Sequence, residues 1–372
     1  MRMNWWMAPL AVLLVLVGVA GGLYLARPKA AVPAGPGGKV QAPSASGGSS
    51  AKPPAEQPKP AEEPPKPVEE PKPAEPAPKR PSDAEAQAFV RTFMEARMAG
   101  NAGKVSAMVA SNATTNGPIR LSGPGARIAG YTAQLLGSGD TDSFSFSLKV
   151  AFATGQPGSE VEAEELRLTW KGGLKVAAYT DAPKESLALG VGQDGKLWLH
   201  RGQATAMVGD LAGLPNTFKP MGAAPGTEFG VGKDGWSVAA VNTAGTHVLW
   251  VTKGLHPLLG ISQVNWQGNP TVTPLDLLFE AGGVDAAWAP GSARYVAVAV
   301  AQPSGATALV IYDATVPAKF GPDLVTTFGN LDFTVRNLRW LSATVVAFDV
   351  QKGSATTGPY TYDINSKKLT QP

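Results

Sequence analysis

The sequence predicts a chain of four parts: a membrane-spanning helix, a disordered spacer, an α+β domain and an all-β domain. Three observations predict this order. Residues 5–25 form an uncharged apolar run, and the residues that follow, up to 81, are rich in Pro, Ala, Gly, Ser, Lys and Glu. From residue 82, apolar residues first recur at helical spacing and then alternate, and similar stretches repeat toward the end of the 372-residue chain.

The first part is the apolar run. A helix needs about 20 apolar residues to cross the hydrocarbon core of a bilayer. The two tryptophans at the start of the run and Tyr24 near its end suit the two membrane interfaces. We therefore expect residues 1–26 to be a signal anchor that contacts the lipid bilayer through residues 5–25. A cleavable signal peptide is the alternative, since Gly18-Val19-Ala20 is a small-x-small site, although it lies inside the run.

The second part is the spacer, residues 27–81. Its first half is Gly/Ser-rich and should be flexible, whereas its second half repeats Pro with Lys and Glu and should favour extended polyproline II. We expect a disordered stalk that holds the folded part outside the cytoplasm, at the cell surface or in the periplasm. A generic tether and a Pro-rich ligand for an SH3-like domain are the alternatives.

Composition excludes several classes of function. The net charge of +3 comes from mixed acids and bases without a basic stripe, so we expect no nucleic-acid partner. The chain has no cysteine, which excludes disulfides, thiolate metal sites, cysteine catalysis and lipoprotein acylation. Only three histidines are present.

The third part, residues 82–182, has the pattern of an α+β domain. Ser82 and Glu85 form a capping-box pattern before a helix with one apolar stripe, which includes Arg97 and ends at Gly100-Asn101. A short second helix should cover residues 102–110. Residues 143–152 then alternate between apolar and polar side chains, as in a strand with one buried face. A hairpin should follow over residues 166–176.

Residues 88–101 and 164–179 resemble the first helix and the last hairpin of NTF2-like cone domains. Enzymes of that family carry His, Asp or Tyr in the cone pocket, but this segment has no His and only Tyr131 and Tyr179. The resemblance therefore implies a pocket or docking surface without catalysis. Glu162, Glu164 and Glu165 cluster on one strand, and we expect them to form a solvated strand face and no acid–base pair.

The fourth part, residues 183–372, repeats a strand-rich pattern. The full copies are residues 227–254, 284–314 and 335–364, and residues 187–203 are a partial copy. Corresponding positions recur every 50–60 residues or so, which is typical of propellers and related arrays. They are Leu197, Leu249, Leu309 and Tyr360 in the strands, and Phe229, Trp288 and Trp340 at the front of the full copies.

Trp288-Ala289-Pro290-Gly291 and Leu309-Val310-Ile311-Tyr312-Asp313 resemble blades of TolB-type and WD40-like propellers. About four blades fit, which is the lower end of the roughly 4–8 blades of closed propellers. The array should be a minimal ring, an open half or one half of an oligomer. Because open sheets expose their edges, we expect self-association through propeller edges or packing on the α+β domain.

Motifs for common catalytic and nucleotide sites are missing from the sequence. His200 and His247 could approach each other but lack a supporting acid, and His256 lies in a loop, so we predict no metal, cofactor or catalytic residue. Asp313 and Asp363 should cap turns. The tryptophans should form blade core and no sugar platform; they are Trp198, Trp250, Trp266, Trp288 and Trp340.

Together these features predict a membrane-anchored extracytoplasmic binding or scaffold protein of the bacterial cell envelope, and not an enzyme. It would present a cone domain and a propeller-like domain to another envelope protein or a cell-wall polymer. The alternative is a small-ligand sensor or glycan-acting enzyme that uses the cone pocket or the propeller channel.

Overall fold

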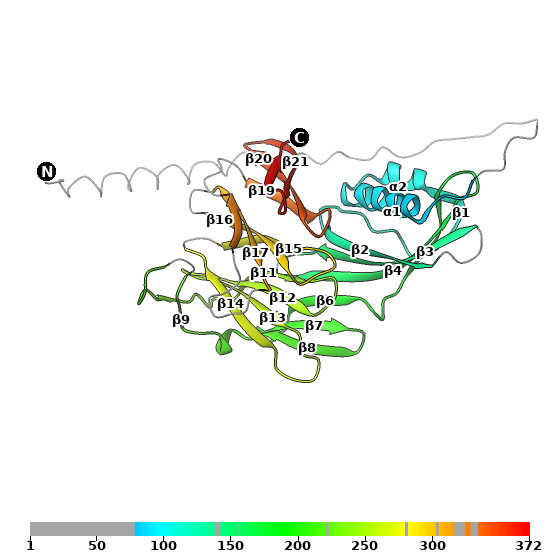
Figure 1. Ribbon diagram of the computed structural model, residues 1–372. Helices are drawn as coiled ribbons and strands as arrows, with labels where there is room; N and C mark the ends of the chain where they lie inside the picture. Colours follow the sequence, from blue (N-terminus) through cyan, green and yellow to red (C-terminus); the bar gives the residue numbers. More distant parts are fainter. Residues whose placement is uncertain are drawn as a thin grey trace, which may run out of the picture. The chain divides into compact units, whose positions relative to one another are not determined.

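A computed structural model describes residues 79–137, 142–155, 157–220, 223–279, 282–302, 305–315, 324–328 and 334–372 (Figure 1). The expected anchor and nearly all of the expected spacer lie outside these residues. Within the described ranges, no helix has both the length and the apolar character that crossing a membrane requires. The described chain belongs to one compact unit, Glu75–Pro372.

Two helices open this unit, as the sequence predicts. In α1, Asp83–Met98, the Ser82 hydroxyl accepts the Glu85 N–H at 3.3 Å, and the Glu85 carboxylate accepts the Ser82 N–H at 2.7 Å. This capping box satisfies two N–H groups that the first turn leaves without helical partners. Gly100 ends the helix with φ +65°, and the Asn101 side chain caps α2, Ala102–Met108.

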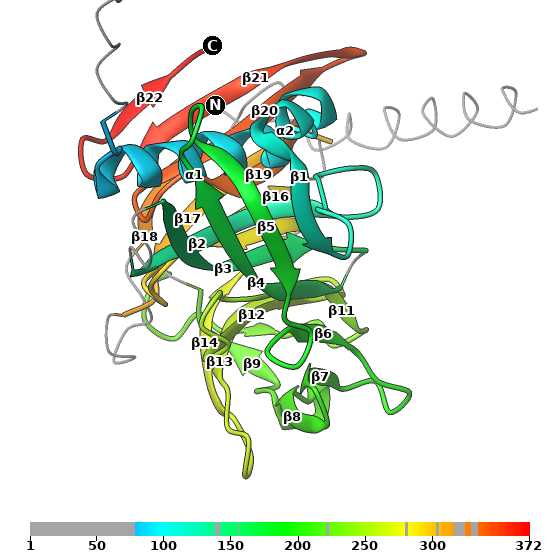
Figure 2. The ribbon, with the colours of Figure 1, turned by 90° about the vertical axis from the view of Figure 1, so that its right-hand side faces the viewer.

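Five strands follow the helices: β1 Val109–Asn116, β2 Arg127–Gly137, β3 Ser143–Ala153, β4 Ser159–Thr169 and β5 Lys175–Asp181. They lie in the order β1-β5-β4-β3-β2, and only β1 and β5 run parallel. Both helices lie across one face of this sheet (Figure 2). The apolar residues of β3 alternate as predicted, because those at even positions from Phe144 to Phe152 share the core with Phe93 and Met94 of α1.

The expected domain boundary near residue 182 falls inside one eight-stranded sheet. The strands β6 Leu187–Val191, β7 Leu197–Arg201 and β8 Ala204–Gly209 continue from β4. The first residues of β4, Ser159–Val161, pair with β6, whereas its second half pairs with β5. Strand β4 therefore belongs to both parts of the unit, and no break in hydrogen bonding separates them.

Three further sheets each contain four consecutive antiparallel strands. The first is β11 Trp236–Val241, β12 His247–Thr252, β13 Leu258–Gln263 and β14 Thr271–Leu277; the second is β15 Gly282–Trp288, β16 Tyr295–Ala301, β17 Thr307–Asp313 and β18 Leu324–Phe328; the third is β19 Thr334–Trp340, β20 Val345–Lys352, β21 Ala355–Asp363 and β22 Lys368–Thr370. A 3₁₀ turn, Leu211–Gly213, and the short pair β9 Thr217–Phe218 and β10 Phe229–Gly230 precede them. This arrangement confirms that the part of the chain after β5 has a propeller-like, mostly β fold.

Tryptophans link each sheet to the one before it. The indole N–H of Trp288, at the end of β15, donates to the Ala240 carbonyl of β11 at 2.9 Å. Trp340, at the end of β19, donates to the Ala287 carbonyl of β15 at the same distance. The predicted equivalence of these two tryptophans therefore reflects one repeated contact between neighbouring sheets.

The predicted frame of the first full copy, residues 227–254, is wrong by one strand. Phe229 lies in β10, outside the four-stranded sheets, and Val241 occupies the place that Trp288 and Trp340 hold in theirs. Leu249 consequently lies on β12, the second strand of its sheet, whereas Leu309 lies on β17, the third strand of its sheet. The counterpart of the turn at Pro290, between β15 and β16, is the loop at residues 242–246, between β11 and β12.

The last sheet packs against the α+β part of the unit. Strand β19 lies against β2, and a Cβ at Gly130 of β2 would lie 3.8 Å from the Cβ of Trp340. Ala129 of β2 shares a buried cluster with Trp340 and Phe348. Of the two outcomes expected for an incomplete array, packing on the α+β domain is therefore present, and self-association stays a prediction.

Candidate functional site

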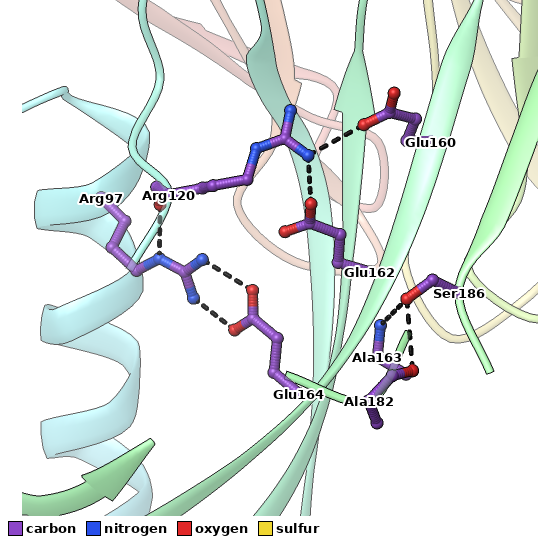
Figure 3. Close-up of polar contacts among 8 residues, drawn as sticks. All are labelled: Arg97, Arg120, Glu160, Glu162, Ala163, Glu164, Ala182 and Ser186. Carbon is purple, nitrogen blue, oxygen red and sulfur yellow. Dashed lines mark hydrogen bonds and ion pairs between the residues drawn. The ribbon is translucent and has the colours of Figure 1, made fainter. Parts of the chain in front are cut away.

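A buried ion pair joins α1 to β4. The two terminal nitrogens of the Arg97 guanidinium lie 2.6 and 2.8 Å from the two carboxylate oxygens of Glu164, and Figure 3 shows this parallel pairing. Both side chains are 0% exposed. Burial alone would lower the pKa of Arg97, but the hydrogen bonds and the charge of Glu164 outweigh it and raise that pKa. The same burial, with the charge of Glu164, raises the pKa of the neighbouring Tyr179 hydroxyl.

A second arginine, Arg120, pairs with two further acids of β4. Arg120 donates to the carboxylates of Glu160, at 2.8 Å, and of Glu162 (Figure 3). Burial raises the pKa of Glu162, although Arg120 opposes the rise. Asp181 lies near Glu162, and its Oδ1 atom is buried without a hydrogen-bond partner among the described residues. Of the two acids that Arg120 binds, Glu160 keeps 38% of its side chain exposed, whereas Glu162 keeps only 16%.

The predicted solvated strand face is wrong for two of its three residues. Glu164 is buried and Glu162 is half-buried, and only Glu165 is exposed. Strand β4 alternates as expected, but α1 covers the face that carries the even-numbered acids. The missed signal is Arg97, a cation in line with the apolar stripe of α1, which requires a buried acid opposite it.

A further arginine ties the α+β layer to the propeller-like sheets. Arg127, the first residue of β2, donates to Asp285 of β15 at 2.5 Å and to the Leu338 carbonyl of β19. Asp285 also accepts the Leu338 N–H at 3.2 Å. Burial raises the pKa of Asp285, and the charge of Arg127 opposes this. One ion pair thus joins three strands that are distant in sequence.

A groove opens beside this junction. It has a volume of about 710 Å³ and lies between the turn at residues 123–127 and residues 334–337 of β19. A second hollow of about 500 Å³ lies on the other side of the same turn, and Arg127 and Asn337 line both. We call these two hollows together the seam groove. The volumes are in the range of ligand sites.

The β19 wall of the seam groove has an unusual backbone. Asn337 adopts φ +52°, in the left-handed region that residues with a Cβ rarely occupy, and the ladder between β19 and β20 is irregular there. Its side chain donates to Asp349 at 2.7 Å, and Arg339 also binds Asp349. Such strained positions cluster at functional sites.

Charge in the seam groove does not cancel completely. Asp285 is paired with Arg127, and Asp349 with Arg339. Arg336 is exposed and lines the groove, and its side chain has no ion pair or hydrogen bond with any other described residue. One guanidinium therefore remains available to an anionic group of a ligand.

The three histidines lie in different surroundings. His200 is exposed on β7, His247 lies with its ring centroid 6.2 Å from that of Trp288, and His256 packs edge-on against Phe229 and Phe279. In the part of the chain that the structure covers, no group of three or more His, Asp or Glu residues could hold a metal.

The remaining singled-out residues are mainly structural. The Asp313 and Asp363 carboxylates accept N–H groups in the turns that follow β17 and β21. Trp250, Trp288 and Trp340 are buried in the sheets. Trp198 and Trp266 are partly exposed: the N–H of Trp198 binds Asp194, and the ring of Trp266 carries the Arg201 guanidinium, 4.5 Å from its centroid.

Comparison with known proteins gives no family. No family model matches the chain, and no curated protein matches it. It is similar to a solved puromycin hydrolase, with 13% identity and a TM-score of 0.30, over 62% of this chain and 45% of that one. It is also similar to a puromycin-hydrolyzing peptidase of Mycobacterium tuberculosis, with 10% identity and a TM-score of 0.29, over 65% and 45%. Oligopeptidase B from Leishmania major matches at 12% identity and a TM-score of 0.24, over 64% and 40%.

The chain spans less than half the length of each of these structures. Their names are those of hydrolytic enzymes, which contradicts the prediction that this chain is not an enzyme, and that prediction is withdrawn. Their activities are properties of those proteins. The resemblance to NTF2-like domains receives no support from these comparisons and stays a prediction.

Proposed function

We propose that this protein is a membrane-tethered, extracytoplasmic binding protein of the bacterial cell envelope, which contacts an envelope protein or a cell-wall polymer through the seam groove. The groove carries the proposal. It is open, it lies between two tightly joined parts of the unit, and it holds the unpaired Arg336 beside the strained Asn337. Because Arg127 and Asp285 fix both walls, a ligand would meet a preformed surface.

The tether rests on the sequence. The apolar run at residues 5–25 and the Pro-rich spacer would place the groove at a distance from the bilayer. The absence of cysteine from the chain offers a clean test of this topology. In intact cells or spheroplasts, a membrane-impermeant maleimide should label Lys352→Cys and should leave Met3→Cys unlabelled. Labelling of Met3→Cys alone would contradict the extracytoplasmic placement.

The groove itself can be tested by site-specific crosslinking. A photo-crosslinking amino acid at position 336 of the full chain in its host should capture an envelope protein or a wall fragment. The matched control is position 191, because Val191 is also exposed, at 45%, but does not line the groove. No product from position 336, or the same products from both positions, would contradict the proposal.

A further inference from the structure

A separate cleft opens between α1, β2 and the turns that follow β15 and β19. Its volume is about 730 Å³, and it shares no lining residue with the seam groove. A cleft of this size is typical of sites that bind small molecules. We call it the helix cleft.

Two opposite charges face the helix cleft from α1. Arg91 and Glu95 lie one helical turn apart, and both are exposed and line the cleft. An intrahelical pair is weaker when the cation precedes the acid, as it does here. No ion pair joins either side chain to another residue within the described ranges. A positive and a negative group thus remain available at neighbouring positions.

A tyrosine from β2 lies within reach of both charges. Burial raises the pKa of Tyr131 to about 12, with the charge of Glu95 adding to the rise and that of Arg91 opposing it. The phenol therefore remains protonated at neutral pH. Its hydroxyl has no hydrogen bond with a described residue, which leaves one neutral donor for a ligand.

The rest of the lining is largely apolar. Val90 and Phe146 are each 1% exposed and form part of the floor, and Leu341 and Pro290 contribute from the two turns. An apolar body would therefore lose water on entering the cleft, which favours binding. A purely polar ligand would not gain this contribution.

We propose that the helix cleft binds a small zwitterion with an apolar body, either a free apolar amino acid or a short apolar peptide. Its carboxylate pairs with Arg91 and accepts a hydrogen bond from Tyr131, its ammonium pairs with Glu95, and its side chain packs against the partly exposed Leu341. A simple anion would be repelled by Glu95 and a simple cation by Arg91. This site is independent of the function proposed for the seam groove.

Calorimetric titration of the full chain in detergent micelles tests the ligand class with four probes. Leucine and the dipeptide Leu-Leu carry both charges, leucinamide lacks the carboxylate, and N-acetylleucine lacks the ammonium. We expect leucine or Leu-Leu to bind at least about tenfold more tightly than either blocked compound, because each blocked compound loses a charge-assisted hydrogen bond. The tighter of the two zwitterions identifies the source. Equal binding of all four probes, or of none, would overturn the proposal.

Variants then assign the groups. We expect Arg91→Gln and Glu95→Gln each to weaken binding of the preferred zwitterion by about tenfold, and Tyr131→Phe by a few-fold. Arg91 and Glu95 are exposed on α1, so these changes should leave the fold intact. Arg167→Gln and Glu165→Gln are matched controls on the exposed face of β4 and should bind normally. Unchanged binding in Arg91→Gln and Glu95→Gln would remove the assignment.

Discussion

At the scale of single residues, the arginines of the α+β layer decide where the acids of β4 can lie. Arg97 reaches Glu164 with two hydrogen bonds and uses its third nitrogen to hold the Arg120 carbonyl at 3.0 Å. Arg120 in turn holds Glu160 and Glu162. The chain that leads from α2 toward β2 is therefore anchored through its backbone and its side chain.

Removing one partner of the buried pair should be costly. Glu164→Gln leaves the Arg97 charge buried without its counter-ion, so we expect a loss of about 3–5 kcal/mol in the free energy of unfolding, measured with urea. Glu165→Gln, one residue away on the exposed face, should leave the urea midpoint unchanged. The double variant Arg97→Met with Glu164→Leu should recover most of the loss. Equal effects of Glu164→Gln and Glu165→Gln would contradict the buried position of Glu164.

The pH dependence of the free energy of unfolding should reveal the protonation of Asp285. Burial raises its pKa in the folded chain above the unfolded value, so the folded state binds the proton more tightly. The stability contributed by this group is therefore present at pH values below the unfolded pKa of about 3.9 and is lost as pH rises through the higher folded pKa. Relative to Asp285→Asn, the wild-type chain should lose stability over that rise, as followed by thermal unfolding. Asp363→Asn is the control and should keep the wild-type pH trend, because Asp285 is unchanged in it; loss of that trend in Asp363→Asn, or its persistence in Asp285→Asn, would contradict the assignment to Asp285.

At the scale of elements, the propeller-like sheets depend on hydrogen bonds between strands of different sheets. The indole of Trp340 is fully buried, and its N–H satisfies the Ala287 carbonyl on β15, an edge strand of the preceding sheet. The backbone of β15 would otherwise face the interface with an unpaired acceptor.

Replacing the indole tests this link. Trp340→Phe should lower the free energy of unfolding by about 1–3 kcal/mol, because it leaves the buried carbonyl without a donor. Trp198→Phe removes an N–H that binds only Asp194 in its own turn, and it should have a much smaller effect in the same chemical unfolding experiment. A larger loss in Trp198→Phe than in Trp340→Phe would show that the inter-sheet hydrogen bond contributes little.

At the scale of the whole molecule, the ladder between β4 and β6 joins the α+β part to the propeller-like sheets. The Ser159 hydroxyl also accepts the Val241 N–H at 3.0 Å, so β4 contacts the second sheet as well. We expect residues 79–372 to unfold in a single transition by circular dichroism. Neither residues 79–182 nor residues 183–372 should keep a cooperative transition alone, since each loses a strand partner. Two transitions, or a stable fragment, would show that the parts fold separately.

Features set by residues close in sequence could be predicted, whereas contacts between residues far apart in sequence could not. The Ser82 capping box, the alternation in β3 and the similarity of Trp288 to Trp340 depend on local patterns, and all three occur. Arg97 with Glu164 and Arg127 with Asp285 join residues 67 and 158 positions apart, and no local period marks such partners. The seam groove was missed for the same reason, because its walls meet only after these distant pairs form.

The contact between β2 and β19 has a consequence for how the chain is made. Strand β2 leaves the ribosome early, but the sheet that covers Ala129 is formed by residues 334–372, which are synthesised much later. Until residues 334–372 arrive, the part of the early sheet that β19 covers has no neighbour there, and exposed apolar surface of this kind invites aggregation. If the chain is exported before it folds, the same order applies to its emergence from the membrane. The early sheet must therefore stay bound to chaperones, or remain loosely packed, until residues 334–372 have been delivered.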